Sequence, residues 1–401
     1  MNSKRKIVTA PLLICLICFP AIFTAVGGTM TVLGASGTVE HHTVFKCGED
    51  GYHTYRIPSI IQAKDGTLVA FAEGRRDNRG DPGRGHIDLV YKLSNDGGRT
   101  WSSLHILEKA KEGGSASNPT VVMDNNSGRI IIIYPLWEPA MYYRNSLPGT
   151  SDNRVIMRFS DDYGQNWSKA EDITHQARHE QWGFTAFGPG HGIQTSTGRL
   201  IIPAFSNSPE IEDDNPLKKR AAFALYSDDG GKTWQRGQQI AASTHENQIV
   251  GLDDGRLMMD ARQINSEIQM RWMAISNDQG ETWSKPTQTQ ICAEICAGLL
   301  RYPLKGRCSG NLLLWSGIKG PNRTNLILRL SYDQALTFPI EMLIGPGPAG
   351  YSDLTLLKNG DVGMLWENGK EDYREKILFT RIPRKVIRNM WQISNLNRNV
   401  N

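Results

Sequence analysis

The sequence predicts an all-β fold, and its composition, a repeated turn and alternating apolar runs support this prediction. The chain has 401 residues, including 40 Gly, 19 Pro and 10 Trp, and 39% of it is hydrophobic. So much Gly without a G-X-Y period indicates many tight turns, and this length allows a large buried core. Charged residues make up 21% and the net charge is +4, which excludes a disordered, highly charged chain and gives no strong nucleic-acid signal.

The first predicted element is an export segment over residues 1–36. Basic residues at positions 4–6 precede an apolar run from Ile7 to Val26, which is the order found in a secretory signal. The run is long and contains no clean cleavage site, so an uncleaved membrane anchor is the alternative. We therefore expect a secreted or cell-envelope (periplasmic) protein, with anchoring through this segment as the second option.

Outside the export segment the chain has four cysteines, Cys47, Cys292, Cys296 and Cys308. Disulfides are possible in an exported chain, and the last three could form one bridge with one thiol left over, although sequence does not determine the pairing. No second C-x-x-C or paired His lies nearby to complete a zinc site. We expect no metal and no cofactor.

An octapeptide of the form S-x-D-x-G-x-T-W is the most regular feature of the chain. Four copies and one decayed copy occupy residues 94–101, 160–167, 227–234, 276–283 and 331–338. The Asp can accept backbone N–H groups and the Gly can adopt a positive φ, so each copy is expected to close a hairpin. The Trp is expected to pack the turn onto its own sheet. No copy supplies the ligand set of a calcium loop, so we expect structural turns.

The segments between these turns are predicted to be strands. Each octapeptide follows an alternating apolar run such as Ile87 to Leu93, which indicates a half-buried strand. Five marked turns and one unmarked unit predict six small sheets of roughly 55–60 residues, arranged as one six-bladed β-propeller over residues 37–383. No stretch predicts a long amphipathic helix. Residues 384–401 are predicted to be a C-terminal tail, either an expression remnant or a solvated end.

The segment Tyr55-Arg-Ile-Pro58, followed by the octapeptide (Asp-box) turns, resembles the sialidases, or exo-α-neuraminidases. The resemblance covers nearly the whole chain after the export segment. It implies a six-bladed propeller and a glycoside hydrolase that releases terminal α-linked sialic acids. The implied substrates are sialylated glycoproteins, glycolipids or oligosaccharides.

The resemblance also implies a cluster of arginines, because sialic acid carries a carboxylate on its anomeric carbon and an Arg fork binds a carboxylate bidentately. Arg56 matches the arginine of the R-I-P segment, Arg262 matches the second and Arg323 the third. Arg329 is the alternative to Arg323, but a structural ion pair is the simpler role for it. Arg75 resembles a further family arginine near the carboxylate and glycerol side of the pocket.

The implied nucleophile is a tyrosine. A carboxylate that attacked a carbon bearing another carboxylate would meet like-charge repulsion, and sialidases are the glycosidases that use Tyr instead. Tyr351 matches this residue, and Glu246, 16 residues before Arg262, matches the glutamate that activates it. For Tyr351 taken alone, a core or rim tyrosine would be the simpler interpretation.

The implied acid/base is an aspartate in the loop after the first hairpin. Asp81 matches it, and Asp77 is the alternative, with a salt bridge to a neighbouring Arg as its simpler role. To donate a proton near neutral pH, Asp81 needs a pKa raised by burial or by the negative charge of the substrate.

Three weaker matches accompany these residues. Glu73 lies in a segment that resembles the end of the family's first-blade strand. The glycine-rich segment 188–193 would bring backbone close to the site. The aromatic segment Tyr134 to Trp137 is a candidate lining of the N-acetyl pocket.

The expected reaction is retaining hydrolysis through a tyrosyl-enzyme intermediate. A trans-sialidase would share every residue named above, so it stays an alternative. A non-catalytic sialic-acid-binding propeller is a further alternative, which should lack the tyrosine, the glutamate or the acid.

Overall fold

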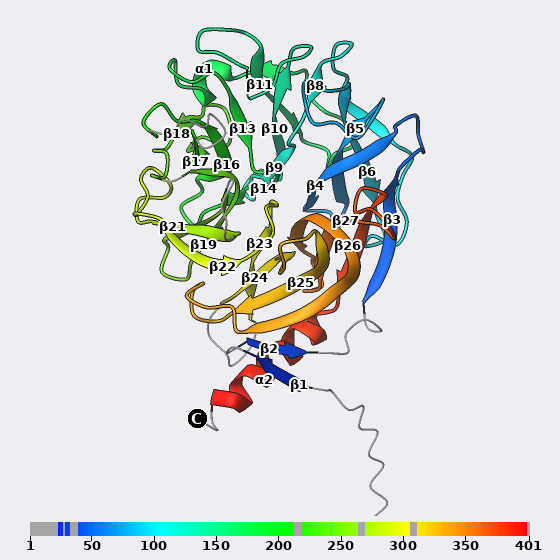
Figure 1. Ribbon diagram of the computed structural model, residues 1–401, viewed down its shortest axis with the longest axis vertical. Helices are drawn as coiled ribbons and strands as arrows, with labels where there is room; N and C mark the ends of the chain where they lie inside the picture. Colours follow the sequence, from blue (N-terminus) through cyan, green and yellow to red (C-terminus); the bar gives the residue numbers. More distant parts are fainter. Residues whose placement is uncertain are drawn as a thin grey trace, which may run out of the picture.

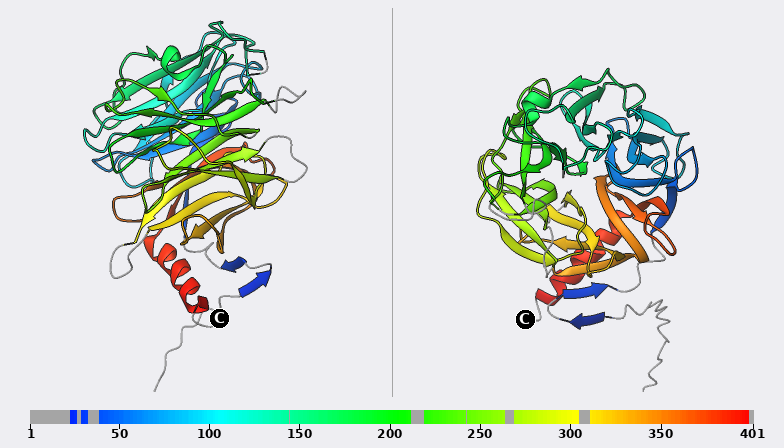
Figure 2. Two further views of the ribbon diagram at one scale, coloured as in Figure 1. Left: turned by 90° about the vertical axis from the view of Figure 1, so that its left-hand side faces the viewer. Right: turned by 45° about the horizontal axis from the view of Figure 1, so that its top comes forward.

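The computed structural model describes residues 23–26, 29–32, 39–143, 145–211, 219–241, 243–263, 269–304 and 311–398. Within these ranges the regular structure is almost entirely β-strand, and the sheets surround a central axis, as Figure 1 and the right-hand view of Figure 2 show. The predicted all-β fold is therefore confirmed. Cys308 and most of the predicted export segment lie outside the described residues.

The first half of the chain forms β1 (Phe23–Val26), β2 (Thr29–Val32), β3 (Glu40–Lys46), β4 (Thr54–Gln62), β5 (Leu68–Arg75), β6 (Ile87–Ser94), β7 (His105–Glu108), β8 (Ser115–Ala116), β9 (Thr120–Met123), β10 (Ile130–Trp137), β11 (Asn153–Ser160), β12 (Glu171–Asp172), α1 (Thr174–Ala177), β13 (Thr185–Phe187), β14 (Gly190–His191), β15 (Ile193–Gln194) and β16 (Leu200–Asn207). The second half forms β17 (Arg220–Ser227), β18 (Gln235–Arg236), β19 (Thr244–Gly251), β20 (Leu257–Gln263), β21 (Met270–Ser276), β22 (Thr287–Ile291), β23 (Gly298–Pro303), β24 (Asn311–Ile318), β25 (Thr324–Ser331), β26 (Ile340–Leu356), β27 (Val362–Asn368), β28 (Lys376–Ile382) and α2 (Arg384–Arg398).

Most neighbouring strands pair antiparallel with the strands next to them in the chain. Strand pairing joins them into four sheets of nine, ten, five and four strands. The long strand β26 belongs to two neighbouring groups, because its first part pairs with β25 and its last part with β27. β3 pairs with β28, so the start of the described ring joins its end. The joined sheets do not by themselves divide into six units, and the blade count stays a prediction.

The octapeptide copies form one type of hydrogen-bonded turn. In the copy after β17, Ser227 Oγ donates to Asp229 Oδ1 at 2.9 Å and accepts the N–H of Gly231 at 2.9 Å. Asp229 Oδ1 also accepts the N–H of Thr233 at 2.9 Å. Gly231 has a φ of +87°, as the turn requires. The same three bonds occur in the copies that begin at Ser94, Ser160, Ser276 and Ser331.

The Trp of the turn contacts the neighbouring sheet, which differs from the expectation that it packs onto its own sheet. Trp234 follows β17 and donates its indole N–H to Met157 Sδ on β11 at 3.3 Å. A Cβ added to Gly231 would lie 2.3 Å from Ile131 Cδ1 on β10. The turn therefore holds adjacent sheets together, and its glycine allows the close approach.

The segment after Pro383 is a helix, so the prediction of a solvated tail was wrong. In α2, the side chains of Val386, Ile387 and Met390 are buried and join the largest apolar cluster. Asp361 Oδ1 accepts the N–H of Arg384 at 2.8 Å and so satisfies a donor at the start of the helix. α2 lies beneath the ring, near the β1–β2 hairpin (Figure 1). Among the described residues, no helix is long and apolar enough to cross a membrane.

The described cysteines are not paired. Cys47, Cys292 and Cys296 are free thiols, so Cys292 and Cys296 do not form the bridge that was considered for them. Within the described part of the chain, no group of three His, Cys, Asp or Glu side chains is arranged to hold a metal ion.

Candidate active site

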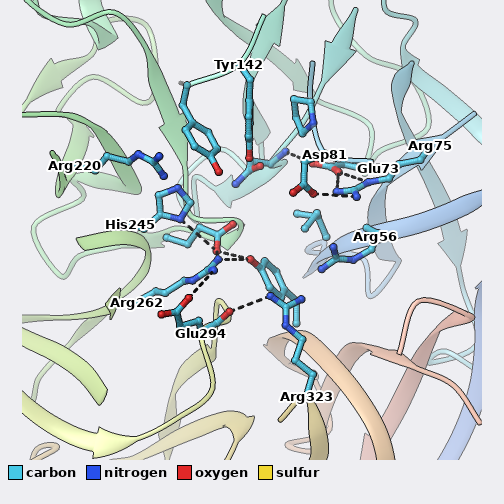
Figure 3. Close-up of a pocket in the computed structure, with 16 residues that line it drawn as sticks. Arg56, Glu73, Arg75, Asp81, Tyr142, Arg220, His245, Arg262, Glu294 and Arg323 are labelled. Carbon is cyan, nitrogen blue, oxygen red and sulfur yellow. Dashed lines mark hydrogen bonds and ion pairs between the residues drawn. The ribbon is translucent and has the colours of Figure 1, made fainter. Parts of the chain in front are cut away.

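A cavity of about 180 Å³ lies inside the ring, and charged and aromatic side chains line it (Figure 3). All seven site residues expected from the sequence are among its lining residues: Arg56, Arg75, Asp81, Glu246, Arg262, Arg323 and Tyr351. They come from β4, β5, β19, β20, β26 and two loops. Residues that are up to 295 positions apart in the chain (56 to 351) thus surround one space.

Tyr351, Glu246 and Arg262 form one hydrogen-bonded group in the cavity lining. The Tyr351 hydroxyl donates to Glu246 Oε2 at 2.5 Å. Arg262 Nη1 donates to the same carboxylate oxygen at 2.6 Å and to the Tyr351 hydroxyl oxygen at 2.8 Å. Both Tyr351 and Glu246 are buried. The arrangement places a carboxylate acceptor and a cation on one phenol.

The electrostatics of this group favour an ionised glutamate and a neutral tyrosine. Burial opposes the charge of Glu246, but Arg262 and the adjacent His245 outweigh it and hold the pKa of the carboxyl well below its usual range. Burial raises the pKa of Tyr351 well above its usual value, and Arg262 only partly offsets this effect. The two shifts together leave a negative carboxylate hydrogen-bonded to a neutral phenol.

Arg56 is held by a buried carboxylate. Its Nε and Nη2 donate to the two oxygens of Glu367 at 2.7 and 3.1 Å. Glu367 Oε1 also accepts the N–H of Ile57 at 2.9 Å, and Glu367 Oε2 accepts the N–H of Tyr351 at 3.1 Å. Ile57 has a φ of +61°, which is unusual for a β-branched residue. Glu367 thus fixes the R-I-P backbone, the Arg56 guanidinium and the Tyr351 backbone together.

Arg323 enters the cavity from the loop before β25. Its Nη1 donates to the Tyr373 hydroxyl at 3.0 Å, and its Nη2 donates to the backbone carbonyl of Glu294 at 3.0 Å. Arg329, the alternative, is absent from the cavity lining and pairs with Glu341 at 3.1 Å. The geometry therefore favours Arg323 as the cavity arginine.

Asp81 and Arg75 lie on the opposite side of the cavity from Glu294 (Figure 3). Arg75 Nη1 is 3.1 Å from Asp81 Oδ1, and Arg75 also donates from Nη2 to the buried Glu73 at 2.7 Å. Burial opposes ionisation of Asp81, but Arg75 and Arg56 outweigh it and lower the pKa of the carboxyl. The charges of these two arginines therefore act against the raised pKa that an acid at this position needs. Asp77 does not line the cavity.

An aromatic wall, defined as Tyr142, Tyr143 and His245, completes the cavity. The Arg220 guanidinium carbon lies 3.7 Å from the centre of the Tyr143 ring, and His245 is tilted against Phe205 with ring centres 4.1 Å apart. Burial lowers the pKa of His245 to about 4. Arg220 also lines the cavity and adds a further positive charge to this wall.

Two of the weaker sequence matches do not line the cavity. Trp137 is buried behind the aromatic wall, where its ring centre is 5.5 Å from that of Tyr142, and it donates to Ser117 Oγ. Tyr134 donates to Glu108 instead. In segment 188–193, the backbone carbonyl of Gly190 accepts a hydrogen bond from the Ser59 hydroxyl, and no residue of the segment lines the cavity. Glu73, by contrast, lines the cavity.

Sequence reasoning missed several residues that position the site. Glu367 lies 311 positions from Arg56, and no local motif connects the two. Glu294 lies in a short loop between apolar residues. Arg220 is the first residue of a strand, and nothing in the local sequence distinguishes it from an ordinary charged residue at a strand end. The only local signal was for His245, which directly precedes Glu246.

Comparison with known proteins agrees with this architecture. The family model for the BNR repeat-like domain matches residues 66–364. The sialidase of Bacteroides fragilis is 28% identical over 359 residues, which cover 82% of this chain and 63% of that protein. The sialidase of Micromonospora viridifaciens is 28% identical over 340 residues, covering 80% of this chain and 51% of that protein. The chain therefore spans less than two thirds of the length of either relative.

Solved structures of sialidases also resemble this chain in fold. The Hadza microbial sialidase Hz136 has 25% sequence identity and a TM-score of 0.76, and the match covers 86% of this chain and 68% of that one. A leech intramolecular trans-sialidase, at 19% identity and a TM-score of 0.72, shares the fold. The fold and the family match define a propeller-like protein of the BNR repeat class. Within that class, the chain belongs to the sialidase family.

Proposed function

We propose that this protein is an exo-α-sialidase that releases terminal α-linked sialic acid with retention of configuration, through a tyrosyl-enzyme intermediate. The observation that carries this proposal is the Tyr351–Glu246–Arg262 group, in which one phenol contacts an ionised carboxylate and an arginine. Arg56 and Arg323 line the same cavity. A cluster of arginines beside a nucleophile suits a substrate with a carboxylate next to the reacting carbon.

In the binding step, Arg56, Arg262 and Arg323 hold the substrate carboxylate. Glu367 and Tyr373 keep two of these guanidinium groups oriented before substrate arrives, which reduces the entropy lost on binding. Arg75 holds Asp81 at the edge of the cavity. The substrate brings a negative charge and excludes water, and both effects raise the pKa of Asp81 toward the range in which it can act as an acid.

In the first chemical step, the Tyr351 oxygen attacks the anomeric carbon and Glu246 takes the phenolic proton. The bond from the anomeric carbon to the glycosidic oxygen breaks, and protonated Asp81 gives its proton to the leaving oxygen. The products are the aglycone alcohol and an aryl glycoside in which the anomeric carbon is bonded to the Tyr351 oxygen. Because Tyr351 is neutral before attack, no second negative charge approaches the substrate carboxylate.

In the second step, ionised Asp81 removes a proton from water, whose oxygen attacks the anomeric carbon. The bond to Tyr351 breaks, and the proton held by Glu246 returns to the phenolate. Two displacements at one carbon leave the product in the α configuration.

Sialylated glycoproteins, glycolipids or oligosaccharides are the proposed substrates, and an exported protein would meet them. Transfer to a sugar acceptor instead of water is the alternative outcome of the second step. Product analysis in the presence of lactose distinguishes the two, because a trans-sialidase forms sialyllactose.

The proposed architecture is a propeller of six blades. The pairing register supports it, because β26 pairs with β25 up to Pro348 and with β27 from Ala349. If β26 is divided there, its last part joins β27, β28 and β3 as one four-stranded group.

A fluorogenic α-sialoside assay tests the proposed function. The wild-type protein should release the fluorophore, and Tyr351→Phe should lose most of this turnover because it lacks the attacking oxygen. Asp81→Asn should retain more activity on this substrate than on sialyllactose, because a good leaving group needs little protonation. A Tyr351→Phe variant with wild-type kcat would show that Tyr351 is not the nucleophile.

A further inference from the structure

Glu294 is a cavity residue to which the proposed reaction assigns no step. Its carboxylate lies beside Arg262 in Figure 3, with its Oε2 3.8 Å from Arg262 Nη2, while its backbone carbonyl accepts a hydrogen bond from Arg323. Its side chain is 28% exposed, in contrast to the 6% exposure of Glu246. Glu294 is therefore a second carboxylate beside an arginine proposed to bind the substrate carboxylate.

The backbone holds Glu294 firmly in this position. Ile295 donates its N–H to the carbonyl of Ala293 at 2.7 Å, which makes a three-residue turn centred on Glu294. Ala293 in turn donates to the carbonyl of Ile318 at 3.1 Å, and Arg271 Nη1 donates to the carbonyl of Ile295 at 2.7 Å. Both neighbours of Glu294 are buried. The side chain thus projects into the cavity from a rigid support.

The carboxylate of Glu294 differs from the other acids that face these arginines. Glu367 and Glu246 accept hydrogen bonds from Arg56 and Arg262 at 2.7 and 2.6 Å. Among the described residues, the Glu294 carboxylate accepts no hydrogen bond, and 3.8 Å to Arg262 is too long for one. Its side chain does not fix the orientation of Arg262, and its main effect is its charge.

We infer that Glu294 sets the affinity of the cavity for carboxylates by weakening the binding of the substrate and of the product. This inference rests on the proposed function, in which Arg262 and Arg323 bind the sialic acid carboxylate. A carboxylate bonded to Arg262 Nη2 would lie roughly 4–6 Å from the Glu294 carboxylate, where like charges repel. Free sialic acid keeps this carboxylate, so the repulsion promotes product release.

The repulsion acts equally on the bound substrate and on the transition state, because the carboxylate is charged in both. Removing it should therefore lower KM and the dissociation constant of the product without raising kcat. If Glu294 instead oriented Arg262, its loss would raise KM and lower kcat. The two roles predict opposite changes in KM.

The experiment compares the wild-type protein with Glu294→Gln and Glu294→Ala. Glu180→Gln, at an exposed position outside the cavity lining, is the matched control. For each protein, KM and kcat are measured on a fluorogenic α-sialoside, and the dissociation constants of free sialic acid and its methyl ester are measured by calorimetry. The thermal unfolding midpoint of each variant confirms that it is folded.

Both Glu294 variants should bind free sialic acid about three- to tenfold more tightly than the wild type, with a parallel fall in KM. The methyl ester should bind all proteins alike, because it carries no charge. The gain should shrink at high salt, since Glu294 is partly exposed. The Glu180→Gln variant should match the wild type.

Weaker or unchanged binding of the acid, or an equal gain for the acid and the ester, would overturn the inference while the proposed function stands. A wild-type protein that neither cleaves the sialoside nor binds sialic acid would overturn the proposed function, and this inference with it.

Discussion

At the level of single residues, the charges around Asp81 bear most directly on the proposed reaction. Burial opposes the ionisation of Asp81, but Arg75 and Arg56 outweigh it and lower the pKa of this carboxyl, which favours its anion. In the proposed reaction, Asp81 donates a proton in the first step, which requires the opposite state. The proposal therefore requires that the charge of the substrate raise the pKa of Asp81 on binding.

This requirement predicts a specific pH dependence. The protonated fraction of Asp81 falls as pH rises above its pKa, so kcat/KM on sialyllactose should fall from pH 5 to pH 8. The fall in kcat should occur at higher pH than the fall in kcat/KM, because kcat reports the enzyme with substrate bound. Rate profiles on sialyllactose measure both. A kcat/KM that rises over this range would contradict the assigned acid.

At the scale of the element, the octapeptide turn connects two sheets. Asp229 accepts the N–H groups of Lys232 and Thr233 and the hydroxyls of Ser227 and Thr233. Partial burial opposes its ionisation, but these hydrogen bonds outweigh burial and lower the pKa of Asp229. The carboxylate therefore stabilises the turn in its ionised form.

Asp229→Ala should reduce the free energy of unfolding by about 1–2 kcal/mol, because it leaves these donors without their acceptor. Asp228→Ala is a matched control at the preceding position, where the exposed Asp228 pairs with Arg199 and the expected loss is only about 0–1 kcal/mol. Urea unfolding at pH 7 measures both losses. Equal losses of unfolding free energy in the two variants would show that the hydrogen bonds of Asp229 do not specifically stabilise the turn.

For the turns, the local structure could be predicted from the sequence, but the contacts with other sheets could not. The octapeptide predicted a hairpin turn from its own residues, and all five copies form the same side-chain-stabilised turn. The partner of its Trp could not be predicted, because Met157 belongs to a strand of the neighbouring sheet. Helix α2 was not predicted, because its basic residues suggested a solvated segment. Its apolar residues Val386, Ile387 and Met390 nevertheless form a buried face.

At the scale of the whole molecule, the ring is joined where β3 pairs with β28. Phe45 on β3 is fully buried in a cluster with Tyr55 and Phe379, although Phe379 lies 334 positions later in the chain. This junction also supports the site indirectly, since Glu367 on the adjacent β27 orients Arg56.

Phe45→Ala should therefore reduce the free energy of unfolding by about 3–5 kcal/mol, the usual loss for a buried Phe. Leu336→Ala, at a side chain that is 77% exposed, should change it by less than about 0.5 kcal/mol. Thermal or urea unfolding measures the two effects. A small loss for Phe45→Ala would mean that β3 contributes little to the closed ring.

The site itself was largely predictable as a set of residues, but its organisation was not. Motifs shared with the sialidases identified seven residues that line one cavity. The residues that hold them, such as Glu367 and Tyr373, contact them only through the three-dimensional arrangement of distant strands. The expectation that the aromatic segment ending at Trp137 lines the cavity was wrong, because a run of aromatic residues does not indicate which side chain faces a cavity.

In the proposed reaction Tyr351 forms a covalent bond to the sugar, and this bond can be trapped. A sialosyl fluoride with a second fluorine at C3 has a good leaving group and forms the intermediate, while the C3 fluorine slows its hydrolysis. Peptide mass spectrometry after incubation should place the added sugar on Tyr351. An adduct on another residue, or no adduct in a protein that cleaves the fluorogenic sialoside, would contradict the claim.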